Sequence, residues 1–212
     1  MMEPSQAEER FAFPAAILTG GRSRRMGRNK FLLPLGSEPV IRRVARILES
    51  VFSRVFAVGG DAPSLDPFGL PVVGDVLPGN DSLGGLHAAI SCAGAPHVFV
   101  AGCDMPFLQP QLLRGLAARA GEADVVIPIL EGFPEPLCAV YGQACEPAIR
   151  RRITEGRLKM IGFHEEMRVL RVEEAEWRAW DPEGLSFRNL NTQQDYEWAL
   201  AEVASKEDMN AG

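Results

Sequence analysis

The 212-residue sequence contains short, almost wholly apolar runs separated by segments with helical periodicity. Such runs are typical of strands covered on both faces of a parallel sheet, because neither face is left for polar side chains. The pattern predicts strands at Phe13–Leu18, Val55–Val58, Leu70–Val73, Val98–Ala101, Val125–Ile129 and Leu137–Tyr141.

Between these runs, apolar residues recur every three or four positions, most clearly from Val40 to Phe52. That spacing places them on one face of a helix. Thr192 and Asp195 have the spacing of a capping box and predict the start of a last helix, which extends to about Ala204. Further helices are predicted at Leu86–Cys92, Pro110–Arg119 and Ala144–Thr154.

Strands that alternate with helices indicate βαβ units. We therefore expect an α/β fold, a Rossmann-like three-layer α/β/α sandwich around a mostly parallel, doubly wound sheet. Residues 13–205 are predicted to form one domain, preceded by a disordered tail at 1–12 and followed by a flexible tail at 206–212. In such folds, ligands bind outside the carboxyl ends of the strands.

Composition narrows the class of protein. A hydrophobic content of 46% supplies a core, and a net charge of -6 argues against nucleic acid or an anionic membrane as partner. No apolar run approaches the roughly 20 residues of a membrane span, and we expect no secretory signal. Four cysteines without a CxxC pair, and only three histidines, favour reduced thiols in a cytoplasmic protein.

The first strand ends at a glycine turn followed by a basic segment. Gly20 and Gly21 allow a sharp turn whose N–H groups can approach an anion closely. No acidic residue occurs from Phe11 to Ser37, although the chain has 28 of them. A solvated basic loop is the plainer alternative, but the coincidence of features favours phosphate binding. The basic side chains are Arg22, Arg24, Arg25, Arg28 and Lys30.

Two aspartates follow later strands. Asp75 comes after the third predicted strand and Asp104 after the fourth. A carboxylate opposite a phosphate loop suggests Mg²⁺, which prefers oxygen ligands. Asp104 could instead cap the helix near Pro110 or close the turn before Pro106. Asp75 could hold the base, the ribose or a metal-bound water.

Two asparagines stand near the end of the chain. Asn189 and Asn191 are two positions apart, so on an extended segment they face the same side. Helix capping accounts for one of them, which favours a binding role for the pair. Cys103 is expected to be a buried small residue rather than a nucleophile. Trp198, like the other tryptophans, is expected to pack rather than to form a stacking platform.

The segment LTGGRSRRMGRNK, supported by VVGD, AGCDMP, EPLCAVY and RNLNT, resembles the molybdenum cofactor guanylyltransferases. These enzymes belong to the wider group of glycosyltransferase-A-like nucleotidyltransferases. The resemblance therefore implies the fold of nucleotide-diphospho-sugar transferases. The resemblance extends from about Phe13 to Ala204. It implies transfer of GMP from GTP to molybdopterin, with release of pyrophosphate and with Mg²⁺ as cofactor.

The resemblance also implies roles for individual residues. Arg25, Lys30 and Asp104 would be catalytic, with Asp104 as nucleotide and magnesium ligand. Asn189 and Asn191 would lie on the acceptor side, in the C-terminal half of the domain. The nucleotide-binding residues of the N-terminal half would be Leu18, Thr19, Gly20, Gly21, Lys30, Asp75 and Asp104.

Some positions depart from the family pattern. Thr19 replaces an alanine, and the strand exit Val58–Gly60 lacks an asparagine that some members have. The expected partners are GTP and molybdopterin, with a molybdopterin-carrying or molybdoenzyme-maturation protein as a further candidate. Rival interpretations are cytidylyl transfer to the pterin, nucleotidyl transfer to a sugar or polyol phosphate, and a non-catalytic nucleotide-binding protein.

Overall fold

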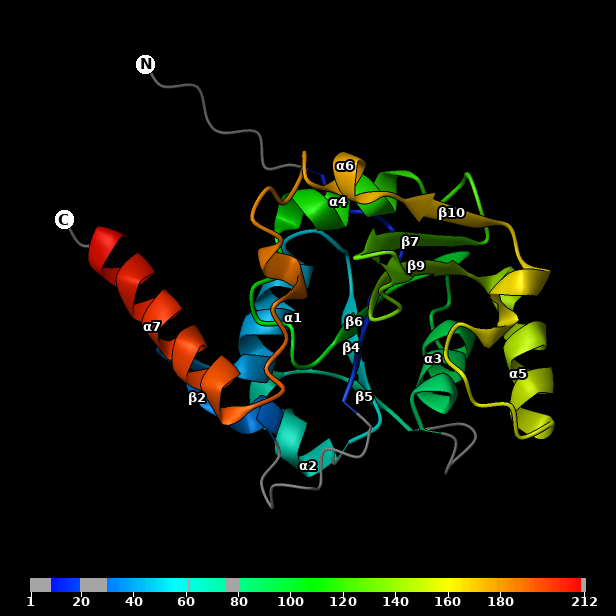
Figure 1. The fold of residues 1–212 in the computed structure, drawn as a ribbon. Coiled ribbons are helices and arrows are strands. Elements are labelled where there is room, and N and C mark those ends of the chain that lie inside the picture. The colour runs from blue at the N-terminus through cyan, green and yellow to red at the C-terminus, as the bar shows by residue number, and fades with distance from the viewer. Residues whose placement is uncertain (1–8, 20–29, 61, 75–80, 211–212) are drawn as a thin grey trace.

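The apolar runs form the strands of one mixed sheet (Figure 1). The computed structural model describes residues 9–19, 30–60, 62–74 and 81–210, with backbone only at Lys30, Asp81 and 206–210. The sheet consists of β1 (Ala15–Leu18), β4 (Val55–Val58), β5 (Val72–Val73), β6 (His97–Gly102), β7 (Val125–Leu130), β8 (Phe133–Pro134), β9 (Cys138–Gly142) and β10 (Val169–Val172). Each predicted strand is therefore present.

The strand order is β10-β7-β9-β6-β1-β4-β5, with β8 paired to β7. β1 runs parallel to β4 and β6, β4 to β5, and β7 to β10. The mostly parallel sheet is thus confirmed, but β9 lies antiparallel between β6 and β7. In this register Ala101 is opposite Cys138, so β9 starts at the edge where β1 and β6 end.

Helices cover both faces of this sheet. Their bounds are α1 (Val40–Glu49), α2 (Ala62–Leu65), α3 (Asp81–Ser91), α4 (Pro110–Ala118), α5 (Glu146–Thr154), α6 (Glu174–Trp177) and α7 (Gln193–Asn210). The short 3-10 turns are η2 (Lys30–Leu32), η3 (Asp66–Phe68), η4 (Gln143–Cys145), η5 (Gly162–Glu166) and η6 (Leu185–Phe187), and β2 (Pro34–Leu35) pairs with β3 (Glu38–Pro39).

Neighbouring side chains of β1 belong to two different apolar clusters, so the core has two layers. Ile17 belongs to one apolar cluster, together with Leu48 of α1 and Leu112 of α4. Leu18 belongs to the other, together with Leu86 of α3. Side chains of a strand point alternately to opposite faces, so each cluster occupies one side of the sheet. Figure 1 shows α3 and α5 together on one side, which completes the predicted three-layer sandwich.

The last helix begins as its sequence predicts. The Asp195 N–H donates to Thr192 Oγ1 at 3.1 Å, and the Thr192 N–H donates to Asp195 Oδ2 at 2.6 Å. This reciprocal pair is the predicted capping box. The helix continues to Asn210, past the predicted end and into the segment assigned to a flexible tail, because no glycine or proline interrupts it. In the described residues, no helix combines the length and apolarity needed to cross a membrane.

Candidate functional site

Hydrogen bonds hold the carboxyl ends of three strands side by side. The Cys103 N–H, just after β6, donates to the Leu18 carbonyl at the end of β1, at 3.3 Å. Thr19 donates both its N–H and its hydroxyl to the Val58 carbonyl at the end of β4, at 3.1 Å and 3.0 Å. The residues that follow these strands are therefore gathered at one edge of the sheet, where ligands bind in doubly wound folds.

Thr19 depends on a glycine of the neighbouring strand exit. Its side chain is buried, with 8% exposed. Gly60 has a φ of 79°, and a Cβ at that position would lie 2.6 Å from Thr19 Oγ1. A glycine is needed there both for the left-handed backbone and for the space that the hydroxyl occupies. Thr19 thus ties the end of β1 to the end of β4 through both its backbone N–H and its hydroxyl.

Asp104 lies in the turn after β6, at the same edge. Its Oδ1 is 2.6 Å from the position that a Cβ on Gly102 would take, so the carboxylate folds back over the end of the strand. The N-cap of α4 is Gln109, which makes no side-chain cap hydrogen bond. The alternative that Asp104 caps this helix is therefore wrong, and its carboxylate remains at the sheet edge.

The asparagine segment joins Asp104 through the backbone. The Leu190 N–H donates to the Asp104 carbonyl at 2.9 Å, which brings Asn189 and Asn191 to the exit of β6. Asn189 Oδ1 is buried and has no hydrogen-bond partner in the described part of the chain. The Asn191 N–H donates to Asp195 Oδ2 at 2.9 Å, beside the capping box. The structure thus places the backbone of the asparagine segment next to the backbone of the predicted aspartate.

A cleft of about 470 Å³ opens along this segment. Glu135, which the sequence patterns did not single out, lies in it because β9 is antiparallel and begins at this edge. The Gly102 N–H donates to the Leu137 carbonyl at 3.0 Å, and the Leu137 N–H donates to Glu135 Oε1 at 3.0 Å. The cleft is lined by Leu130, Glu135, Phe187, Arg188, Asn189, Asn191, Gln194, Asp195 and Trp198.

Two acidic groups influence each other here. Burial raises the pKa of the Glu135 carboxyl above its usual range, and the negative charge of Asp104 adds to that rise. Burial, with a smaller effect of Asp104, also raises the pKa of the Cys103 thiol to about 12. Because a thiolate is the nucleophilic form, this raised pKa agrees with the expectation that Cys103 is not a nucleophile, although the residue is half-buried rather than fully buried.

Trp198 packs against the cluster that contains Phe107, as the sequence predicts, and it also carries an arginine on its ring. The guanidinium of Arg188 lies over its ring, 5.1 Å from the centroid, and both residues line the cleft. Arg188 begins the RNLNT segment, but nothing in the sequence linked this arginine to Trp198. They meet because Arg188 precedes the capping box and Trp198 lies on the helix that the box begins.

Part of the predicted site lies outside the described residues. Gly20, Gly21, Arg25 and Asp75 belong to this part, as do the other arginines of the basic segment. Lys30 begins η2, and only its backbone is described. The structure therefore brings together Leu18, Thr19, Asp104, Asn189 and Asn191, and the position of the phosphate loop relative to them stays a prediction.

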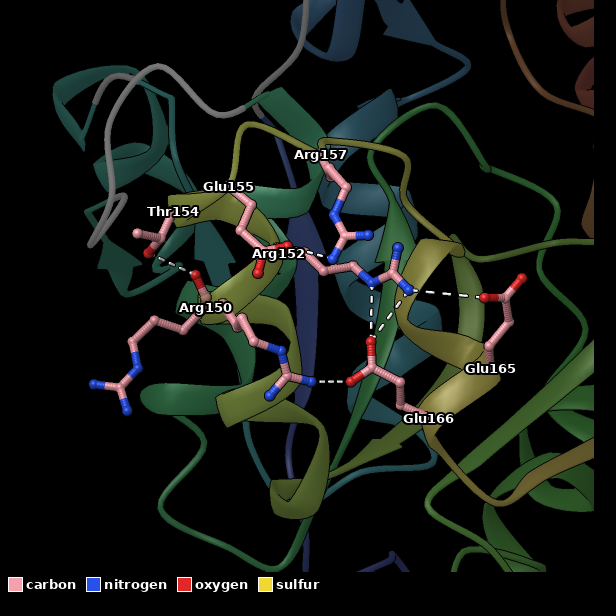
Figure 2. Close-up of polar contacts among 8 residues, drawn as sticks. Arg150, Arg152, Thr154, Glu155, Arg157, Glu165 and Glu166 are labelled. Atoms are coloured by element: carbon pink, nitrogen blue, oxygen red, sulfur yellow. Dashed lines mark hydrogen bonds and ion pairs between the residues drawn. The ribbon is translucent and has the colours of Figure 1, made fainter.

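A second hollow, of about 400 Å³, lies on α5 and carries arginines. Its two arginines are both paired: Arg150 Nε is 3.6 Å from Glu146 Oε1, and Arg151 pairs with Glu166. Figure 2 shows the neighbouring Arg152 on the same glutamate, with Arg152 Nη2 3.1 Å from Glu166 Oε1. Arg157 pairs with Glu155 in the same view. Ion pairs of this kind leave little net charge for a ligand, and we assign no binding role to this hollow.

The fold is that of a nucleotidyltransferase with a nucleotide-diphospho-sugar transferase type of sheet. The family model described as MobA-like NTP transferase domain matches residues 15–169, and the chain belongs to this family. A probable molybdenum cofactor guanylyltransferase from Pelotomaculum thermopropionicum is 40% identical over 84% of this chain and 87% of its own length.

Further relatives agree. A molybdenum cofactor guanylyltransferase from Desulfosudis oleivorans is 32% identical over 91% of this chain and 96% of its own length. The crystal structure of molybdopterin-guanine dinucleotide biosynthesis protein A from Archaeoglobus fulgidus superposes with a TM-score of 0.79 at 29% identity, covering 91% of this chain and 99% of that one. The similarity therefore extends over most of the chain.

Proposed function

We propose that this chain transfers GMP from GTP to molybdopterin, giving molybdopterin guanine dinucleotide and pyrophosphate. The observation that carries the proposal is the hydrogen bond from the Leu190 N–H to the Asp104 carbonyl, at 2.9 Å. It joins the aspartate of a nucleotide-binding sheet edge to the asparagine segment. Relatives at 40% and 32% identity, both named molybdenum cofactor guanylyltransferase, support the choice of substrates.

The two substrates approach from opposite halves of residues 13–205. GTP binds at the exits of β1 and β5, through the backbone of Leu18 and Thr19, the glycine turn, and Asp75. Arg25 and Lys30 neutralise the charge that develops on the leaving pyrophosphate. Asn189 and Asn191 hold the acceptor, so the acceptor phosphate meets the nucleotide at Asp104.

Mg²⁺ is the proposed cofactor, and the residues present fit it. Asp104 offers a carboxylate, and Asn189 Oδ1 is an oxygen without a partner in the described residues. Those residues contain no group of three or more His, Cys, Asp or Glu side chains that could hold a metal. Substrate phosphates and water would complete the shell, as is usual for Mg²⁺. Bound there, the ion stabilises charge on phosphate oxygens.

The chemical step needs little from the protein beyond position and charge. A phosphate oxygen of the acceptor forms a bond to the α-phosphorus of GTP, and the bond from that phosphorus to pyrophosphate breaks in line. The attacking phosphate is ionised near neutral pH, so no general base is required. Cys103 beside the centre stays protonated and does not compete as a nucleophile. Catalysis therefore depends on alignment and on electrostatic stabilisation.

We place this reaction in the cytoplasm, in keeping with four cysteines that form no disulfide. A molybdopterin-carrying or molybdoenzyme-maturation protein is the proposed source or recipient of the pterin.

The proposal is tested by Asp104→Ala in a pyrophosphate-release assay with GTP and molybdopterin. We expect turnover to fall by about 10²-fold or more, the scale for loss of one preorganised electrostatic group. Glu122→Ala is the matched control, because Glu122 lies just beyond α4 and its ion pair within the described residues is with Arg119, at 3.4 Å. Turnover like that of the wild type in Asp104→Ala would refute the assignment.

A further inference from the structure

Arg188 is the cation of the cleft that holds the asparagines. Its side chain forms no hydrogen bond or ion pair with the described residues, and its contact is the ring of Trp198. Many arginines elsewhere on the surface are neutralised, for example Arg178 by Glu174 and Arg151 by Glu166. An arginine left without an acidic partner, at the wall of a substrate cleft, is available to an anionic ligand.

The stack beneath Arg188 fixes where its guanidinium lies. The Trp198 ring meets Phe107 edge to face, with centroids 5.1 Å apart and planes at 68°. Phe107 is buried, with 3% exposed, and lies three positions after Asp104 in the chain. The aromatic pair therefore ties the guanidinium to the segment that carries Asp104. A cation over an indole face is held electrostatically and loses less freedom on binding a ligand.

The two acidic groups of the cleft form no ion pair with Arg188 in the described part of the chain. Asp195 accepts the N–H groups of Asn191 and Thr192, at 2.9 Å and 2.6 Å. Glu135 accepts the Leu137 N–H at 3.0 Å. Each carboxylate thus accepts backbone N–H groups of its own segment. The positive charge of Arg188 is directed at the cleft itself.

We propose that Arg188 binds the terminal phosphate of the acceptor and that Trp198 is its positioning residue. The inference rests on the proposed function, which supplies an acceptor that carries a phosphate monoester. A planar guanidinium can donate two parallel hydrogen bonds to phosphate oxygens, which fixes the orientation of the phosphate as well as its position. Arg188 thereby sets the affinity for the acceptor, whereas the glycine turn and Lys30 serve the nucleotide.

The test is steady-state kinetics of the full chain with GTP and molybdopterin varied separately. Arg188→Ala should raise the KM for molybdopterin about 10-fold or more and leave the KM for GTP unchanged. Arg188→Lys should recover part of the loss, because it keeps the charge without the planar donors. The matched control is Arg178→Ala: Arg178 also stacks on a tryptophan, Trp177 at 4.9 Å, but does not line the cleft.

The positioning role has its own variant. Trp198→Leu should raise the KM for molybdopterin less than Arg188→Ala does. The double variant should match Arg188→Ala, because the tryptophan acts through the arginine. Thermal unfolding checks that each variant is folded. Calorimetric titration with molybdopterin in the absence of GTP should show an affinity that falls more steeply with salt in the wild type than in Arg188→Ala.

Each failure points to a different error. If the wild type turns over and Arg188→Ala has an unchanged KM for molybdopterin, the inference is wrong and the proposed function stands. A rise in the KM for GTP alone would assign Arg188 to the nucleotide and overturn the inference as well. A wild-type protein that does not use molybdopterin would remove the proposed function, and the inference with it.

Discussion

Gly102→Ala separates the position of the Asp104 carboxylate from the stability of the fold. Gly102 is the last residue of β6 and its backbone does not require a glycine, because its φ is not in the left-handed region. A Cβ there would lie 2.6 Å from Asp104 Oδ1 and 3.3 Å from Met105 Cγ. Both neighbours are side chains that can move, so the carboxylate yields rather than the strand.

The size of the effect follows from these distances. Ordinary contacts of a Cβ begin at 3.4 Å, so Asp104 Oδ1 must retreat by about 0.8 Å. A displacement of about 1 Å at a reacting centre costs about 10²-fold in rate. Replacing a glycine by alanine in allowed backbone also lowers the entropy of the unfolded chain, worth about 0.4–1 kcal/mol. We therefore expect turnover to fall about 10²-fold with a melting temperature close to that of the wild type.

The assay is pyrophosphate release with GTP and molybdopterin, alongside thermal unfolding. Gly121→Ala is the matched control, because a Cβ at Gly121 meets nothing within 4 Å. In a protein that already carries Asp104→Ala, the Gly102 substitution should not lower turnover further, because the carboxylate that it displaces is absent. The reasoning is refuted if Gly102→Ala keeps full turnover, or if it costs the same factor with Asp104 removed.

Two further predictions concern groups outside this contact. Lys30→Ala should weaken GTP binding about 10-fold in calorimetry without loss of fold, with Lys159→Ala as the control. An unchanged affinity for GTP would mean that the basic segment does not bind the nucleotide. Burial lowers the pKa of His164 from 6.5 to about 4, so protonation favours the unfolded state and stability falls as pH drops from about 6.5 towards 4. His164→Gln should lose less stability in urea between pH 7 and pH 4.5, by about 1–2 kcal/mol; equal losses would contradict a neutral buried imidazole.

The sequence by itself determined the local elements. Apolar runs located β1, β4, β5, β6, β7 and β9 but not β8 or β10, and helical spacing located α1 and α4, because burial imposes a period on each element. The capping box at Thr192 formed as predicted, since both partners lie within one turn of chain. Asp104 was found at a sheet edge for a similar reason: it follows a strand directly, and parallel strands end together.

Tertiary structure alone decided what surrounds Asp104. The sequence of a short apolar strand does not show whether it runs parallel or antiparallel to its neighbours. The antiparallel orientation of β9, which brings Glu135 to this edge, could therefore not be predicted. The Leu190 bond to Asp104 spans 86 positions of chain, and the stack of Arg188 on Trp198 depends on where α7 packs. Local periodicity reports which face of an element is buried. Which residues meet across the chain is determined only when the layers pack together.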